Sequence, residues 1–182
     1  KNLFPSNIQG LPTWYEIRAN REGYMSASGR VDVMVAMNVQ TYRKDLDEVS
    51  PGGVLIYDST WPRESTLHRN DITVLGVPLA KLCNEAFSVA RIRILMKNVA
   101  YAGVLAALMD IDLKIIKKLL EETFAEKPKL VESNLKAIML GYDYAMENFT
   151  CPLPARAEVM GATSGNILIP ANEATAPACL YP

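Results

Sequence analysis

Val31-Asp-Val-Met-Val-Ala-Met37 is the stretch of sequence that decides the fold. The run is short, almost continuously apolar and rich in β-branched residues, which is typical of a strand buried on both faces of a parallel sheet. We therefore expect a central strand here. Asn38 follows immediately, and residues 39–49 combine apolar and charged positions in a pattern that predicts a helix.

The order of strand and helix then repeats along the chain. Ser50-Pro-Gly-Gly53 predicts a turn, and Val54-Leu-Ile-Tyr57 predicts a second buried strand. A polar loop beginning at Asp58 leads to a further strand within residues 72–79 and a helix at residues 80–87. Such alternation predicts an α/β fold, a three-layer sandwich with a mostly parallel sheet.

Helices are predicted to end this domain. Helical spacing occurs in residues 98–109, 113–124 and 133–148, and Asp112 is a suitable N-cap for the second of these segments. Gly103 lies inside the first segment, where glycine disfavours a helix. It therefore indicates close contact with another helix or with the sheet.

The domain organisation follows from where these patterns stop. Residues 1–149 are expected to form one α/β domain, and residues 150–182 to form a linker with the beginning of a second domain, signalled by Ile167-Leu-Ile169. The first residues carry neither an initiator Met nor a leader-like pattern. We therefore expect Lys1 to be an internal residue of a longer chain.

The bulk composition excludes several classes of protein. With 182 residues the chain is long enough to bury a core, and a net charge of -1 gives no electrostatic basis for binding nucleic acid or an anionic membrane. Apolar runs are shorter than the roughly 20 residues that a membrane span needs. Cys83, Cys151 and Cys179 lie too far apart for a metal or cluster motif, which indicates no metal site and a reducing, cytoplasmic location.

Common catalytic patterns are missing from the sequence. His68 stands alone in a charged loop, which argues against a nucleophile activated by histidine. Paired carboxylates lie on predicted helix faces or caps, where nothing would raise their pKa for acid catalysis. Neither a GxxxxGK[ST] loop nor a complete GxGxxG turn follows a predicted strand.

Two places retain a functional interpretation beside a structural one. Asn38 follows a parallel strand at the edge where open α/β sheets bind ligands, and a helix N-terminus there could receive an anion, although Asn38 also suits a helix cap. The run Pro5-Ser-Asn-Ile-Gln-Gly10 is either a surface turn or a rigid loop that offers hydrogen-bond donors to a ligand.

In their order along the chain, this loop, the strand ending at Asn38 and the segment Ser50–Tyr57 resemble a known family. They are similar to the gamma domain of the 2-oxoacid:ferredoxin oxidoreductases, in the form fused to the amino end of the alpha subunit. The 2-oxoglutarate-type enzymes are the most similar. The resemblance extends over residues 1–148, and it implies that residues 165–175 begin the domain that binds the pyrimidine side of thiamine diphosphate. Two departures are the absence of an opening strand with a GxGGxG turn and the poor fit of residues 176–182.

The resemblance implies a specific reaction and its partners. It implies oxidative decarboxylation of a 2-oxoacid with thiamine diphosphate and Mg²⁺, with electrons passing through a four-iron four-sulfur cluster to ferredoxin and the acyl group passing to coenzyme A. In the family these cofactors lie largely on the beta subunit, so the implied partners are that subunit and ferredoxin, in a dimer of heterodimers.

The resemblance also assigns candidate site residues by position. The loop Pro5–Gly10 would face the active centre, with Lys1 and Asn7 as catalytic candidates. Candidates for binding the substrate or coenzyme A are Ser6, Gln9, Gly10 and Asn38. Two other readings stay open, namely a non-catalytic α/β subunit-interaction module and a Rossmann-like nucleotide-binding domain whose glycine turn is missing.

Overall fold

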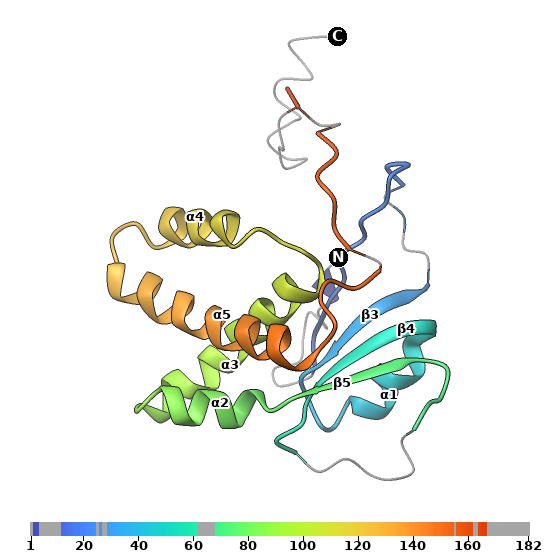
Figure 1. The fold of residues 1–182 in the computed structure, drawn as a ribbon, viewed down its shortest axis with the longest axis horizontal. Coiled ribbons are helices and arrows are strands. Elements are labelled where there is room, and N and C mark those ends of the chain that lie inside the picture. Colours follow the sequence, from blue (N-terminus) through green and yellow to red (C-terminus); the bar gives the residue numbers. More distant parts are fainter. Residues whose placement is uncertain are drawn as a thin grey trace.

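The fold is that of an α/β sandwich, as the sequence predicts, and it is seen in a computed structural model (Figure 1). The residues that the structure describes are 2–3, 12–24, 26, 29–61, 68–154, 156–161 and 164–166. The expected strand at residues 167–169 and the loop at residues 5–10 lie outside them.

The main sheet has three parallel strands in the order β3-β4-β5. Their bounds are Val31–Ala36 for β3, Val49–Asp58 for β4 and Thr73–Val77 for β5. The prediction that the first of these strands is central was wrong, because β4 pairs on both sides and β3 lies at the edge of the described sheet. The apolar run in β3 is instead explained by helices on both faces of that edge.

The predicted turn at Ser50–Gly53 was also wrong, because these residues belong to β4. Val49 pairs with Val31 and Val54 pairs with Val33, so the intervening residues form an irregularity in the ladder. Gly52 has a positive φ of 79°, which the missing side chain permits. Pro-Gly-Gly therefore marks a bulge within a strand here.

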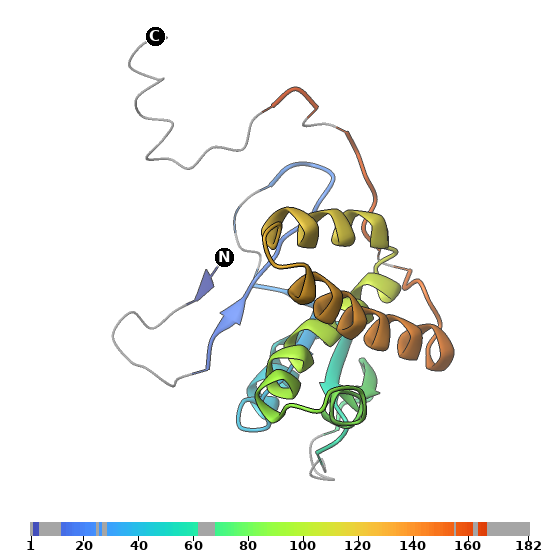
Figure 2. The same ribbon diagram turned by 90° about the vertical axis from the view of Figure 1, so that its left-hand side faces the viewer.

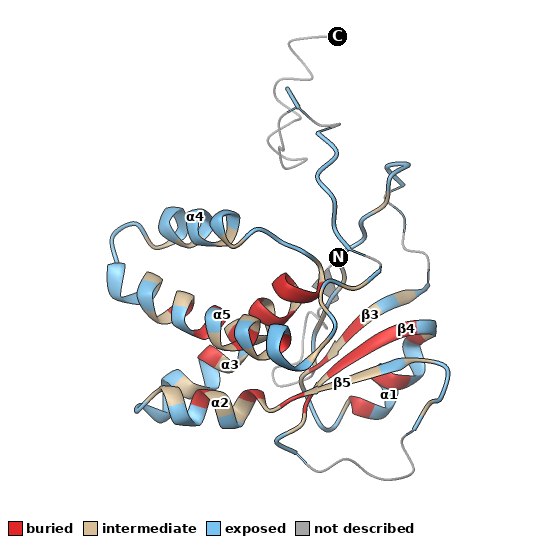
Figure 3. Ribbon diagram, in the orientation of Figure 1, coloured by how far each residue is buried: buried red, intermediate tan, exposed pale blue. Residues whose placement is uncertain are grey.

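Alternation along the strands divides the core into two layers. Met34 and Leu55 point toward α1 (Tyr42–Glu48) on one face of the sheet. Val54 and Ile56 point toward the opposite layer, which contains the other helices (Figure 1). Those helices are α2 (Leu79–Ala86), α3 (Ala90–Leu108), α4 (Leu113–Thr123) and α5 (Pro128–Asn148). Burial is greatest along β4 and in α3, whereas α4 has no buried residue (Figure 3).

Two helices begin at other residues than predicted. The helix after Asn38 begins only at Tyr42, with Thr41 as its N-cap, and α3 begins at Ala90, eight residues before the predicted start at 98. Asp112 caps α4 as predicted, because its side chain accepts a hydrogen bond from the backbone N–H of Lys114.

Gly103 confirms the predicted close contact. A Cβ atom at Gly103 would lie 1.9 Å from the carbonyl oxygen of Ile138 on α5, and one at Gly141 would lie 1.9 Å from that of Ala100 on α3. The two glycines therefore let the backbones of α3 and α5 approach each other directly.

The chain before β3 forms a separate small sheet. β1 (Asn2–Leu3) pairs antiparallel with β2 (Trp14–Tyr15), and neither pairs with the main sheet. Figure 2 shows this hairpin apart from the helical layer. None of the helices in the described ranges is long and apolar enough to cross a membrane.

Candidate functional site

The candidate site is the edge of the main sheet where its parallel strands end. Asn38 follows β3, Asp58 ends β4, and β5 leads directly into the first turn of α2. Because all three strands are parallel, these positions meet at one carboxyl edge, where open α/β sheets bind ligands.

Asn38 forms a turn before α1 and is exposed. Its Oδ1 accepts a hydrogen bond from the N–H of Gln40 at 2.9 Å, and its carbonyl oxygen accepts from the N–H of Thr41 at 3.2 Å. Thr41, one turn later, is the helix N-cap. Asn38 therefore caps the turn that leads into the helix, and its side chain lies at the surface of the carboxyl edge.

The first turn of α1 already contains a carboxylate. Asp45 is 2% exposed, and its oxygens accept hydrogen bonds from the indole N–H of Trp14 and the hydroxyl of Thr41, each at 2.7 Å. The ammonium group of Lys44 lies 3.9 Å from the centroid of the Trp14 ring. A buried negative charge at this position disfavours a second anion close to it, and the binding role of Asn38 stays a prediction.

Asp58 accepts directly from the backbone at the N-terminus of α2. It is 4% exposed, and its Oδ1 accepts hydrogen bonds from the N–H groups of Thr60 at 3.1 Å and Ala80 at 3.4 Å. The hydroxyl of Thr60 in turn accepts from the N–H of Lys81 at 3.2 Å. These bonds occupy the N–H groups that would otherwise be offered to a phosphate.

The second oxygen of Asp58 faces α3. Oδ2 lies 3.6 Å from the ammonium nitrogen of Lys97 and is buried without a hydrogen bond to any described residue. Sequence reasoning missed this pair by assigning Asp58 to a loop. The period of two along Val54, Ile56 and Asp58 places all three on the face toward α3, and that alternation is the signal that could have found it.

The described cysteines are not suited to nucleophilic chemistry. Burial raises the pKa of the Cys83 thiol to about 11, and the neighbouring Asp58 carboxylate also raises it, whereas Lys97 lowers it. Burial likewise raises the pKa of Cys151. Because the thiolate is the reactive species, both groups stay protonated and inert near neutral pH.

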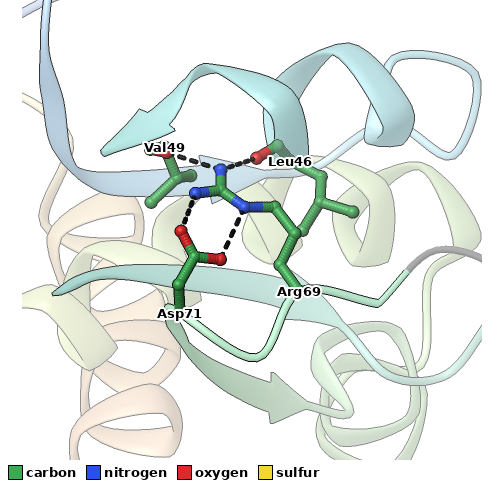
Figure 4. A network of polar contacts seen from close by, with 4 residues as sticks. All are labelled: Leu46, Val49, Arg69 and Asp71. Carbon is green, nitrogen blue, oxygen red and sulfur yellow. Dashed lines mark hydrogen bonds and ion pairs between the residues drawn. The ribbon is translucent and has the colours of Figure 1, made fainter. Parts of the chain in front are cut away.

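A second polar network lies at the opposite, amino edge of the sheet (Figure 4). Arg69 donates to the carbonyl oxygens of Leu46 at 2.8 Å and Val49 at 2.5 Å, at the end of α1, and forms a two-pronged contact with the carboxylate of Asp71. That arrangement fixes the junction between α1 and β4. Because this network lies at the amino edge of the sheet, it stabilises the fold and is not part of the candidate site.

The predicted site residues fall into two groups. Asn38 lies at the carboxyl edge, whereas Lys1, Ser6, Asn7, Gln9 and Gly10 lie outside the described residues. β1 and β2 flank the predicted loop, and the bond from Trp14 to Asp45 places β2 beside the first turn of α1. His68 is exposed, and the described part of the chain holds no group of three or more His, Cys, Asp or Glu that could bind a metal ion.

Fold and site together define an α/β sandwich domain whose carboxyl edge is closed by its own carboxylates. The family model described as "Pyruvate ferredoxin/flavodoxin oxidoreductase" matches residues 1–144. The chain therefore belongs to this family, and the resemblance seen in the sequence is confirmed at that level.

Curated relatives carry the names of enzyme subunits. The ketoisovalerate oxidoreductase subunit VorA of Methanothermobacter thermautotrophicus is 29% identical over 64% of the chain and 23% of its own length. The 2-oxoacid:ferredoxin oxidoreductase 2 subunit alpha of Aeropyrum pernix is 22% identical over 91% of the chain and 33% of its own length. The 2-oxoglutarate synthase subunit KorC of Methanocaldococcus jannaschii is 26% identical over 64% of the chain and 59% of its own length. The chain therefore spans 23% and 33% of the length of the two longer relatives.

Two solved structures share the fold. The 2-oxoglutarate:ferredoxin oxidoreductase of Magnetococcus marinus, with 2-oxoglutarate, coenzyme A and succinyl-CoA bound, is similar with a TM-score of 0.58 and 26% identity over 70% of the chain and 22% of that protein's chain. The gamma subunit of a keto/oxoacid ferredoxin oxidoreductase from Geobacter sulfurreducens gives a TM-score of 0.52 with 19% identity over 64% of both chains. The second similarity concerns the fold alone.

Proposed function

We propose that the chain is the gamma-type domain of an alpha subunit in a thiamine diphosphate-dependent 2-oxoacid:ferredoxin oxidoreductase. In the assembled enzyme it would lie over the active centre and help to enclose the 2-oxoacid or coenzyme A. The observation that carries this proposal is the family match over residues 1–144, together with the similarity to a solved enzyme that is named for this reaction.

The proposed reaction is reversible. A 2-oxoacid, coenzyme A and two oxidised ferredoxins give an acyl-CoA, CO2, two reduced ferredoxins and a proton. For 2-oxoglutarate the acyl product is succinyl-CoA, and this substrate is our first choice because the Magnetococcus marinus enzyme is named for it. The relative named for ketoisovalerate makes a branched 2-oxoacid the competing choice.

The cofactors fit a partner chain better than the described part of this one. A four-iron four-sulfur cluster needs cysteine thiolates, yet Cys83 is buried in the core and its thiol has a raised pKa. The described residues also offer no cluster of carboxylates for Mg²⁺. We therefore assign thiamine diphosphate, Mg²⁺ and the cluster to a beta subunit in a dimer of heterodimers in the cytoplasm, with ferredoxin as the electron acceptor.

We propose the site residues from their positions in the sequence. Lys1 and Asn7 would contact the reacting groups, and Asn38 would bind the substrate or coenzyme A from the carboxyl edge, where its side chain is exposed. The loop residues Ser6, Gln9 and Gly10 would share in that binding.

Steady-state kinetics of the full enzyme, purified with its partner subunit, test the assignment. We expect ferredoxin reduction that requires both coenzyme A and a 2-oxoacid, with 2-oxoglutarate preferred over pyruvate and ketoisovalerate. Asn7→Ala should raise the KM of the 2-oxoacid or coenzyme A or lower kcat. Asn70→Ala, an exposed change beside Arg69 at the opposite edge, is the matched control. Equal kinetics of the two variants would remove Asn7 from the site.

A non-catalytic subunit-interaction module is the second candidate. It is favoured by the carboxyl edge, where Asp58 accepts from the N–H of Ala80 at the N-terminus of α2 and Asp45 places a buried carboxylate near the N-terminus of α1. The same two carboxylates argue against a nucleotide-binding domain. An enzyme that keeps full activity when Asn7 and Asn38 are both replaced by alanine would support the interaction module.

A further inference from the structure

Among the described residues, no backbone hydrogen bond joins the amino-terminal hairpin to the body of the domain. β2 pairs only with β1, and both hydrophobic clusters draw all their members from residues 31–153. The backbone hydrogen bonds of the described loops likewise do not join residues 12–24 to the body. The position of the hairpin therefore depends on contacts made by its side chains.

Trp14 makes the best defined of these contacts. Its indole N–H donates to Asp45 Oδ1 at 2.7 Å, across 31 positions of sequence, and Lys44 lies over its ring. Asp45 is almost fully buried, and Thr41 donates to its other oxygen. A buried carboxylate is costly unless it is hydrogen-bonded, so its Oδ1 requires the donor that Trp14 supplies. Neither phenylalanine nor tyrosine could reproduce an indole N–H at this place.

This contact lies next to the candidate site. Thr41 and Asp45 form the first turn of α1, three and seven residues after Asn38 at the carboxyl edge of β3. A hairpin that is bound to this turn is therefore held at the same edge of the sheet as Asn38.

We propose that Trp14 and Asp45 are a positioning pair, which holds the β1–β2 hairpin at the carboxyl edge and thereby sets the affinity of the enzyme for its 2-oxoacid or coenzyme A. The inference rests on the proposed function. Neither residue touches the substrate; both act through the hairpin that they hold in place.

Trp14→Phe in the purified complex is the central test, because it keeps an aromatic ring and removes only the N–H donor. The KM for 2-oxoglutarate or coenzyme A should rise about 5- to 10-fold, the size expected for one lost hydrogen bond, while kcat changes less than about 2-fold. Asp45→Asn keeps an acceptor for Trp14 and should stay near the parent KM, whereas Asp45→Ala should not. Asp47→Asn, an exposed change on the same helix, should leave the KM unaltered.

Hydrogen exchange on the same complexes separates positioning from folding. In Trp14→Phe the amides of β1 and β2 should exchange faster, while those of β4 and α3 keep their protection. Faster exchange in β4 as well would show that the pair supports the whole fold, and would overturn the inference. The inference would also be overturned if Asn7→Ala raised the KM and Trp14→Phe left the KM unchanged. If Trp14→Phe raises the KM and Asn7→Ala leaves the kinetics unchanged, the proposed role of the loop at residues 5–10 is wrong, and the inference about Trp14 and Asp45 still holds.

Discussion

Asp58 is the residue on which the carboxyl edge depends most. Its Oδ1 accepts from Thr60 and Ala80, and its Oδ2 faces Lys97, so one side chain joins β4, the N-terminus of α2 and α3. A carboxylate that is 4% exposed must have such partners, because an unpaired buried charge costs several kcal/mol. The pair therefore ties the second layer of helices to the middle strand.

Replacing Lys97 tests this role. Lys97→Met keeps the aliphatic length and leaves the Asp58 charge buried without a cation, so we expect the free energy of unfolding in urea to fall by about 2 kcal/mol, below the usual cost because Lys97 is partly exposed. Lys117→Met removes an exposed lysine that lies 3.8 Å from Glu121. This control should change the free energy of unfolding by less than about 0.5 kcal/mol. Similar losses for both variants would show that the buried pair contributes nothing specific.

The Arg69–Asp71 pair predicts a dependence of stability on pH. The hydrogen bond from Arg69 lowers the pKa of Asp71 below its usual value of 3.8, and the pKa of Arg69 is raised, so Arg69 stays charged. A lowered folded-state pKa gives stability that is present above the unfolded pKa and lost as the pH falls through the folded one. The urea midpoint of Arg69→Met should therefore lie below that of the parent at pH 6, and the difference should narrow below pH 4 to what the lost bonds to Leu46 and Val49 leave. A difference in urea midpoint that stays constant from pH 6 to below pH 4 would show that the Arg69–Asp71 pair does not stabilise the fold.

At the scale of elements, the crossing of α3 and α5 is the tightest contact of the helical layer. Gly103→Ala would place a Cβ atom 1.9 Å from the carbonyl oxygen of Ile138, a backbone atom that cannot move alone. The two helices must separate, and we expect a loss of about 3 kcal/mol in urea unfolding, at the upper end for an overpacked core. Asn98→Ala, exposed on the same helix, is the control. A loss below about 1 kcal/mol would mean that the helices slide without cost.

Local composition predicted the elements, and distant contacts decided their ends. The apolar runs of β3 and β4 and the cap at Asp112 are local signals, and each of these elements is present. The break between α2 and α3 depends in part on a distant residue, because Lys136 on α5 donates to the carbonyl oxygen of Ala86, which lies 50 residues earlier in the chain. The bulge at Gly52 needed the register of the neighbouring strand, which a single sequence does not contain.

The candidate site was predictable only in part. Asn38 could be found because it ends a recognisable strand, and it does lie at the carboxyl edge. Asp45 and Asp58 lie in a predicted helix and at the start of a predicted loop, where local sequence does not indicate burial, since their partners Trp14 and Lys97 lie 31 and 39 residues away in the sequence. The loop at residues 5–10 stays a prediction.

For the whole molecule, packing places the body of the domain between residues 31 and 157. Cys151 and Leu153 pack against the cluster of α3 and α5, and the N–H groups of Leu153 and Ala157 donate to the carbonyl oxygens of Leu108 and Met109. The predicted boundary at residue 149 stays a prediction, and these contacts carry the packed body a few residues beyond it. Neither Trp14 nor Tyr15 of β2, in contrast, is a member of either cluster.

Truncation should therefore cost less stability at the amino end than at the carboxyl end. A chain that begins at Gly29 loses the bond from Trp14 to Asp45 but no residue of the core, so we expect cooperative urea unfolding with a free energy lower by about 1 kcal/mol and an almost unchanged m-value. A chain that stops after Thr150 loses Leu153 and leaves the carbonyl of Leu108 unpaired, which should cost about 3 kcal/mol. Loss of cooperative unfolding in the first truncation would show that the hairpin belongs to the core, and would require another account of why neither hydrophobic cluster contains it.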